Sequence, residues 1–217
     1  YPKLKEFPFI NPIEFDLYSY QLEGKQELIN IRHGNVSIPT GCGKSLILLT
    51  LLQKCGLPSV VVTPSKSIFN ELYKEFQYRL GKSLVGGYGD GKKDIKKPIT
   101  IAIGKSLTML KEDTEAYDFF ANKKVMAIDE SHTFAAEQLE KVSHGVLSNI
   151  PYRFFVSATQ TRNDGTEKLL QSIIGKTVVE FSIKEAIDKD FLCPLKFKVI
   201  KTFSSSTVKK KEPIECK

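Results

Sequence analysis

The sequence predicts an α/β fold: a doubly wound, mostly parallel sheet with helices on both faces. Short apolar runs follow one another along the chain, separated by longer segments with helical periodicity. This order is typical of parallel strands joined by crossover helices. A glycine-rich turn and an acidic pair each follow such a run directly, as expected where strands end at one edge of a sheet. With 217 residues and 41% hydrophobic content, the chain can bury one full core.

The individual elements follow from local patterns. Short runs rich in Val, Ile and Phe predict strands, and longer amphipathic or leucine-rich runs predict helices. Strands are expected near residues 35–38, 59–63, 99–103, 124–128 and 153–157. Helices are expected near residues 20–31, 44–54, 66–80, 135–147 and 166–174. Residues 86–97 are expected to be a loop, because glycine and lysine dominate them.

One domain is predicted over residues 15–195, preceded by an N-terminal extension at 1–14 and followed by a linker at 196–217. The linker has the composition of a disordered segment, with a serine run and three consecutive lysines. It holds seven lysines against two glutamates, which is +5 of the net charge of +7. The remaining body is only about +2, so overall charge is weak evidence for a nucleic-acid partner.

The cysteines and the hydropathy pattern bear on location. Cys42, Cys55, Cys193 and Cys216 show no paired spacing typical of a zinc site or a disulfide framework. This usage predicts a reducing interior, and we expect an intracellular, cytoplasmic location in a bacterium or a phage-infected host rather than a nuclear one. No apolar run approaches the length of a membrane span, so no membrane partner is expected.

The most informative motif is a phosphate loop at residues 38–45, Ile-Pro-Thr-Gly-Cys-Gly-Lys-Ser, between a predicted strand and a predicted helix. Glycines let the backbone turn around an anion, and the helix N-terminus directs N–H groups at it. The Lys44 side chain adds a full charge, and the Ser45 hydroxyl can hold Mg²⁺. The strict pattern has glycine where this chain has Ile38, and an ordinary glycine-rich turn is the alternative. The residues predicted to bind the nucleotide phosphates are Thr40, Gly41, Cys42, Gly43, Lys44 and Ser45.

A second motif, Asp129-Glu130-Ser131-His132, follows the buried run at 125–128. Two carboxylates at the carboxyl end of a parallel strand would face the phosphate loop across the edge of the sheet. One can hold the Mg²⁺ shell while its neighbour polarises an attacking water. An acidic pair that caps a helix is the alternative.

With these two motifs the chain resembles the first RecA-like motor lobe of superfamily 2 helicases and translocases of the Asp-Glu-x-His kind, over about residues 15–195. Gln21 stands where such motors place a glutamine that recognises adenine. Ser157-Ala158-Thr159 matches the motif that couples the nucleotide site to the second lobe. Within the superfamily the chain is most similar to the branch of XPB-type and phage UvsW-type DNA helicases, because Arg162-Asn163-Asp164 stands where the XPB group has Arg-Glu-Asp.

The resemblance implies roles for particular residues. Lys44, Asp129 and Glu130 would be catalytic, with Glu130 as general base and with Ser45 and Asp129 holding Mg²⁺ beside ATP. The residues implied to couple the nucleotide site to the second lobe are His132, Ser157, Thr159 and Arg162. The residues expected on loops at strand ends, where they would contact a nucleic-acid backbone, are Ser65, Lys66, Gly86, Gly87, Lys105 and Ser106.

The function implied by the resemblance is that of an ATP-dependent DNA helicase or translocase. Its expected partner is single-stranded, forked or branched DNA rather than RNA, together with a second RecA-like lobe in the full-length chain. Two alternatives share these motifs: the motor of a restriction or nuclease system, and an ATP-gated module that binds nucleic acid or translocates polypeptide without unwinding. No Gln/His-x-x-Gly-Arg-x-x-Arg stretch follows Thr159, so these 217 residues are expected to be nearly inactive by themselves.

Overall fold

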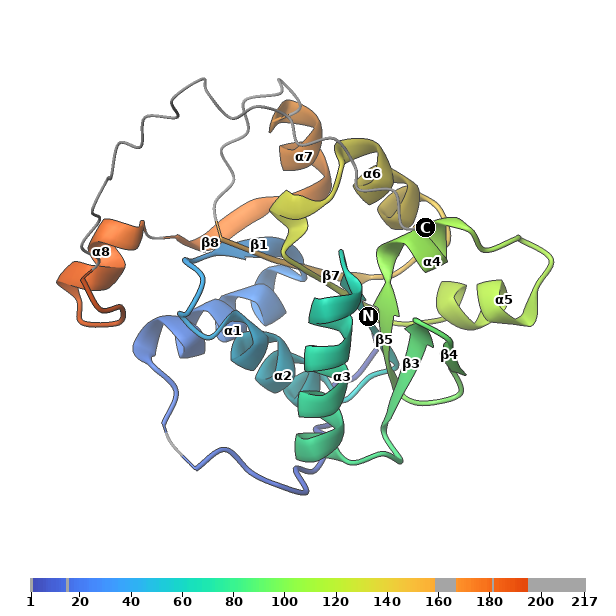
Figure 1. Ribbon diagram of the computed structural model, residues 1–217, viewed down its shortest axis with the longest axis horizontal. Helices are drawn as coiled ribbons and strands as arrows, with labels where there is room; N and C mark the ends of the chain where they lie inside the picture. Colours follow the sequence, from blue (N-terminus) through green and yellow to red (C-terminus); the bar gives the residue numbers. More distant parts are fainter. Residues whose placement is uncertain (1, 15, 159–166, 181, 195–217) are drawn as a thin grey trace, which may run out of the picture.

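An eight-stranded sheet runs through the molecule with helices on both faces (Figure 1). The computed structural model describes residues 2–14, 16–158, 167–180 and 182–194. The strand order is β4-β3-β5-β2-β6-β7-β1-β8, and neighbouring strands are parallel except for the antiparallel pair β3 and β4. The predicted fold class, a mostly parallel and doubly wound sheet, is therefore confirmed.

The strands are β1 (His33–Ser37), β2 (Ser59–Thr63), β3 (Val85–Gly89), β4 (Lys92–Asp94), β5 (Ile99–Ile103), β6 (Val125–Asp129), β7 (Tyr152–Ser157) and β8 (Lys176–Glu180). The helices are α1 (Ser19–Ile31), α2 (Lys44–Cys55), α3 (Lys66–Leu80), α4 (Gly104–Thr108), α5 (Glu115–Ala121), α6 (Ala136–His144), α7 (Glu167–Ile174) and α8 (Ile183–Asp188). A short 3₁₀ turn, Ser131–Thr133, lies between β6 and α6.

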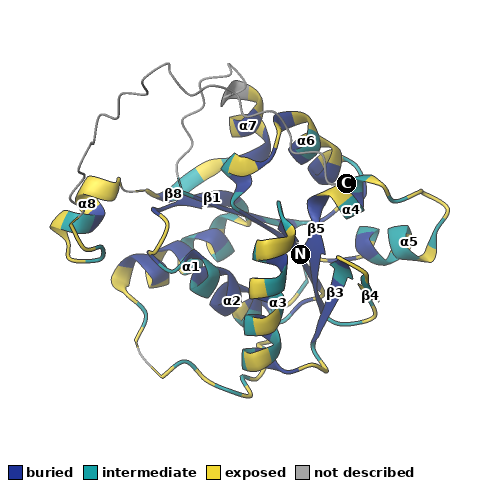
Figure 2. Ribbon diagram, in the orientation of Figure 1, coloured by how far each residue is buried: buried dark blue, intermediate teal, exposed yellow. Residues whose placement is uncertain are grey.

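The sheet separates two hydrophobic cores. Successive side chains of a strand point to opposite faces, so Val61 joins one core while Val60 and Val62 join the other. Helices α1, α2 and α3 cover the first face, and α4, α5, α6 and α7 contribute to the second. The central strands β2, β5 and β6 are buried along their whole length, because helices shield both of their faces. Figure 2 shows β5 in the dark blue of buried residues.

The prediction of a loop at residues 86–97 is wrong. Most of this segment forms the hairpin of β3 and β4, in which Gly91 lies at the turn with φ +78° and Gly86 serves close packing. A Cβ atom at Gly86 would lie 2.0 Å from the carbonyl oxygen of Asp94 in the neighbouring strand. Glycine is needed there because the β4 backbone approaches too closely for any side chain.

Other differences concern short elements. The helix predicted at 135–147 ends at His144, and β8, α4, α5 and α8 were not predicted. All five predicted strands and the other four predicted helices are present. The strands at 59–63 and 99–103 and the helix at 66–80 have the predicted bounds, and the ends of the others shift by at most two residues. The helices α4, α5 and α8 were missed because five to seven residues span too few turns for a periodic signal, and β8 was missed because its two valines are flanked by polar residues.

Residues 2–14, within the predicted N-terminal extension, pack against the domain. The Lys5 N–H donates to the Cys55 carbonyl at 3.3 Å, and the Phe7 N–H donates to the Gln53 carbonyl at 2.9 Å. The segment thus lies along the C-terminal end of α2. The predicted linker at 196–217 lies outside the described residues. Over the described part of the chain, none of the helices combines the length and the apolar character that crossing a bilayer requires.

The parallel order places the predicted motifs at one edge of the sheet. The phosphate loop follows β1, the acidic pair begins at the end of β6, and Ser157 ends β7. Strand β7 lies between β1 and β6, with Ser37 opposite Ser157 and Asp129 opposite Val156. Strands that share a direction end at a common edge, so motifs far apart in the sequence meet there.

Candidate active site

The phosphate loop owes its shape to its two glycines. Gly41 has φ +91° and Gly43 has φ +76°, values that only glycine adopts without strain. Gly43 is the N-cap of α2, so the helix begins with Lys44. The free N–H groups of the first helical turn therefore lie at the loop, as a phosphate site requires. A groove of about 900 Å³ begins beside it, lined by Gly43 and Ser45 and continuing between α2 and α3.

The loop lysine contacts the acidic motif directly. The Lys44 ammonium lies 3.1 Å from Oε1 of Glu130 and donates to the Thr40 hydroxyl at 3.4 Å. Lys44 is only 6% exposed, so the pair is shielded from water. Glu130 also has φ +49°, an uncommon conformation for a residue with a side chain. The structure thus brings together the predicted phosphate-binding lysine and the predicted general base.

Three buried oxygens at this point have no hydrogen-bond partner among the described residues: Asp129 Oδ1, Glu130 Oε2 and Ser131 Oγ. Buried oxygens are normally paired, so these fit a site for a hard cation and water. Within the described part of the chain, no cluster of three His, Cys, Asp or Glu side chains could hold a metal alone. Mg²⁺ needs no such cluster, since it uses one or two carboxylates together with substrate phosphates and water. Asp129 and Ser45 are the residues that would hold it.

His132 joins the acidic motif to β7. Its Nδ1 accepts a hydrogen bond from the Ala158 N–H at 3.3 Å and lies 3.3 Å from Glu130 Oε2. A ring nitrogen that accepts cannot also donate, so we assign the proton to Nε2. His132 thus contacts the Ser-Ala-Thr motif, as the resemblance implies. Ser157 is buried and donates to Asn35 Oδ1 at 3.5 Å, whereas Thr159 and Arg162 lie outside the described residues.

The glutamine expected to recognise adenine contacts the phosphate loop. Gln21 is 3% exposed, and its Nε2 donates to the Cys42 carbonyl at 3.3 Å while its Oε1 accepts from the Tyr18 N–H at 3.0 Å. Tyr20 was not predicted as a site residue, yet its hydroxyl donates to the same carbonyl at 2.7 Å. The feature of the sequence that could have identified Tyr20 as a site residue is its position next to Gln21.

The residues expected to contact nucleic acid are only partly on loops. Ser65 is the N-cap of α3 and accepts from the Ile68 N–H at 3.4 Å, and Lys66 is the first helical residue. Lys66 is exposed and lies 2.5 Å from the Asp90 carboxylate at the turn of the β3–β4 hairpin. Lys105 and Ser106 belong to α4 rather than to a loop, because the chain turns into a helix directly after β5.

The placement of Gly86 and Gly87 on a loop is wrong. Both are buried within β3, and a Cβ atom at Gly87 would lie 3.0 Å from the Tyr73 ring and 3.2 Å from both the Phe69 ring and the Lys92 side chain. Their backbone groups lie in the strand registers that join β3 to β4 and β5. Buried strand glycines of this kind cannot present N–H groups to a phosphate without opening the sheet.

The buried Asp129 should make folding depend on pH. Burial, and then the neighbouring Glu130, raise the pKa of Asp129 from 3.8 to about 7. The folded state therefore holds a proton that the unfolded state has released between about pH 4 and pH 7, so the free energy of unfolding falls as the pH rises through this window. From pH 5 to pH 8 this loss should be roughly 1–3 kcal/mol, at about 1.4 kcal/mol per pKa unit.

The test is urea unfolding of the wild type and Asp129→Asn at both pH values. The variant should lack this part of the pH dependence, so its stability relative to the wild type should increase at pH 8. If the free energies of unfolding of the wild type and of Asp129→Asn differ by the same amount at pH 5 and at pH 8, Asp129 ionises normally in the folded state.

Replacing Lys44 with alanine should weaken Mg·ATP binding by about 10- to 150-fold, because a charge-assisted contact worth roughly 1.5–3 kcal/mol is lost. The change also leaves the Glu130 carboxylate without its cation, so some stability should be lost. In Lys44→Ala/Glu130→Gln that stability should return while the affinity stays low. Calorimetry and thermal unfolding measure the two effects, and unchanged affinity in the single variant would remove Lys44 from its role.

Comparisons with known proteins identify the family and the fold of the chain. A family model described as "Type III restriction enzyme, res subunit" matches residues 14–162. The DNA 3'-5' translocase XPB2 of Sulfurisphaera tokodaii is 26% identical over 210 residues, which is 95% of this chain and 44% of that protein. The putative ATP-dependent RNA helicase QP509L of African swine fever virus (isolate Pig/Kenya/KEN-50/1950) is 28% identical over 178 residues, which is 75% of this chain and 33% of that protein.

Among solved structures, the UvsW helicase of bacteriophage T4 has the same fold. It superposes with a TM-score of 0.65 at 17% identity, over 82% of this chain and 64% of that one. The chain spans less than half the length of the two relatives above.

Proposed function

The chain belongs to the family described as the type III restriction enzyme res subunit, and from this premise we propose that it is the ATP-binding motor lobe of a DNA helicase or translocase. Its resemblance to the first RecA-like lobe of superfamily 2 helicases is confirmed by the family match, by relatives named as helicases or translocases, and by the fold of UvsW. The observation that carries the proposal is the contact of Lys44 with Glu130 across the sheet edge, beside the unpaired oxygen of Asp129.

In the proposed mechanism the loop from Thr40 to Ser45 would cradle the phosphates of ATP, and Asp129 with Ser45 would hold Mg²⁺. When bound, Mg²⁺ neutralises charge on the phosphate oxygens. Glu130 accepts a proton from the attacking water. Lys44 contacts Glu130 in the structure, so a phosphate group would compete for the same ammonium and free the carboxylate. Binding of the nucleotide would thereby prepare the base.

We propose DNA as the track, in single-stranded, forked or branched form, and a second RecA-like lobe in the full-length protein. The archaeal relative is named a DNA translocase, whereas the viral relative is named an RNA helicase, so both polymers need testing. Ser65, Lys66, Lys105 and Ser106 are proposed to contact the backbone, since they follow β2 and β5 at the edge that carries the nucleotide site. A cytoplasmic location in a bacterium or a phage-infected host stays a prediction.

The test is ATP hydrolysis by the full-length protein with single-stranded DNA, forked DNA, single-stranded RNA or an unfolded polypeptide. DNA should stimulate turnover most, and displacement of a labelled strand from the fork should require ATP. If only RNA stimulates ATP hydrolysis, RNA rather than DNA is the track. Stimulation by polypeptide alone would contradict the helicase proposal.

The second candidate is the motor of a restriction or nuclease system, which the description of the matching family favours. For this candidate we propose movement along duplex DNA without separation of its strands. Displacement of a third strand from a triplex, without displacement of a strand from a fork, would favour this alternative over a helicase.

A further inference from the structure

We propose that Tyr20 is a positioning residue that sets the direction of the Cys42–Gly43 peptide in the phosphate loop. The inference rests on the proposed nucleotide-binding function of that loop. It concerns a residue of α1 that no phosphate-loop pattern includes. It also gives Gln21 a second role beside the recognition of adenine.

Two donors from α1 meet one carbonyl of the loop. The Tyr20 hydroxyl donates to the Cys42 oxygen at 2.7 Å, and Nε2 of Gln21 donates to the same oxygen at 3.3 Å. A carbonyl oxygen has two lone pairs, so its capacity is filled. Tyr20, Gln21 and Cys42 are each at most 6% exposed, so water does not compete for these bonds.

The two bonds fix more than the carbonyl. A trans peptide is planar, so its N–H points opposite to its C=O. With the Cys42 oxygen held toward α1, the Gly43 N–H must point away from α1, on the side where α2 begins. Rotation of this peptide would instead direct the Cys42 oxygen at a bound phosphate and repel it. The Tyr20 hydroxyl therefore keeps the Gly43 N–H, rather than the Cys42 oxygen, directed at the phosphate site.

Gly43 tolerates this arrangement only because it has no side chain. A Cβ atom there would lie 2.4 Å from Gln21 Nε2, and φ is +76°. Glycine populates both signs of φ, so Gly43 by itself would leave the Cys42–Gly43 peptide free to rotate. A loop that requires glycine therefore needs an external restraint, and Tyr20 supplies one.

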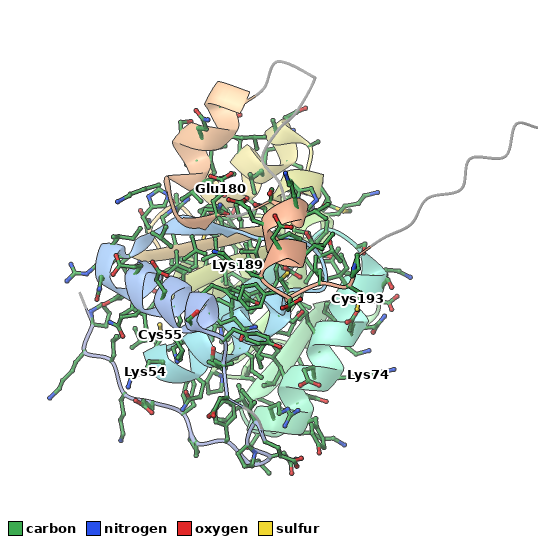
Figure 3. The ribbon with its side chains drawn as sticks, turned by 90° about the vertical axis from the view of Figure 1, so that its left-hand side faces the viewer. Lys54, Cys55, Lys74, Glu180, Lys189 and Cys193 are labelled. Carbon is green, nitrogen blue, oxygen red and sulfur yellow. The ribbon has the colours of Figure 1, made fainter. Side chains whose placement is uncertain are left out.

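Aromatic packing holds Tyr20 in place. Its ring stacks on Tyr18, with centroids 5.7 Å apart, and lies 4.7 Å from the ring of Phe191. Phe191 lies in the chain between Lys189 and Cys193, and Figure 3 shows these two residues on the side of the molecule that faces the viewer. Burial raises the pKa of Tyr20, so the hydroxyl keeps its proton and stays a donor.

The experiment is calorimetric titration of the wild type, Tyr20→Phe and Gln21→Ala with Mg·ATP, Mg·GTP and inorganic tripolyphosphate. Tyr20→Phe keeps the ring and removes only the hydroxyl. Because the hydroxyl acts on the loop and not on the base, affinity for all three ligands should fall by the same factor, about 2- to 10-fold. Tyr18→Phe is the matched control, since its ring also stacks on Tyr20 but its exposed hydroxyl makes no bond to Cys42, and it should bind as the wild type does.

A second measurement separates positioning from packing. The amide proton of Gly43 should shift on addition of tripolyphosphate to the wild type, and this shift should shrink in Tyr20→Phe even where thermal unfolding is unchanged. Unaltered affinities, or a loss for ATP that spares tripolyphosphate, would overturn the inference. If Gln21→Ala loses only the preference for ATP over GTP, Gln21 has no part in positioning the loop. If the wild type binds none of the three ligands, the proposed nucleotide site itself is wrong.

Discussion

Replacing Glu130 with glutamine in the full-length protein should reduce ATP turnover by about 10²- to 10⁴-fold while Mg·ATP binding is kept. An amide cannot accept a proton from water, but its oxygen can still accept a hydrogen bond from Lys44, which lies 3.1 Å from Glu130 in the structure. The loss should therefore be confined to the chemical step. The buried Oε2 atom, which has no hydrogen-bond partner among the described residues, is the oxygen available to the attacking water.

Asp129→Asn is the matched comparison, because it makes the same chemical change at the adjacent residue. Here the metal loses a charged ligand, so Mg²⁺-dependent binding should fall together with turnover. Single-turnover hydrolysis and calorimetry with and without Mg²⁺ distinguish the two variants. A wild-type rate in Glu130→Gln would assign the base elsewhere, and equal loss of Mg·ATP binding in both variants would show that both carboxylates hold the metal.

The 217-residue chain by itself should hydrolyse ATP on the order of 10³- to 10⁵-fold more slowly than the full-length protein. Superfamily 2 motors bind ATP between two lobes, and the second lobe supplies arginines that stabilise the transferring phosphoryl group. The sequence after Thr159 holds no Gln/His-x-x-Gly-Arg-x-x-Arg stretch. The groups that bind phosphate are present, so binding of the nucleotide should persist in a weaker form.

ATP hydrolysis by the 217-residue chain, with and without single-stranded and forked DNA, measures this directly. Its DNA binding should also be weak and should fall steeply with salt, because only one lobe contacts the backbone. Full-length protein with the arginines of the proposed second lobe replaced is the control, and it should match the isolated chain in rate. Robust DNA-stimulated turnover by these 217 residues would show that the two-lobe requirement does not hold for this protein.

Much of the site could be predicted because its chemistry is local. Gly41 and Gly43 have positive φ, and Lys44 follows them directly at the start of α2, so adjacent residues are enough to define the loop. Asp129 ends a strand that is apolar along its length. Patterns of this kind do not depend on where the rest of the chain lies.

Other parts could not be predicted, because they depend on which segments become neighbours. Glycine and lysine at 86–97 have the composition of a loop, but the close approach of β4 makes Gly86 part of a buried strand. Lys66 was expected to be available to a phosphate, but the hairpin turn places Asp90 beside it. Composition limits the conformations that a segment can adopt, and pairing with a neighbouring strand selects one of these conformations.

The sequence by itself determined the fold class, the phosphate loop and the acidic pair, since each rests on the conformational preferences of consecutive residues. Only the tertiary structure decided that Lys44 pairs with Glu130 and that Tyr20 holds the Cys42 carbonyl. These contacts join residues remote in sequence. They form because β7 lies between β1 and β6 and because α1 packs against α2, and strand order and helix packing are set by burial of the whole core rather than by any local pattern.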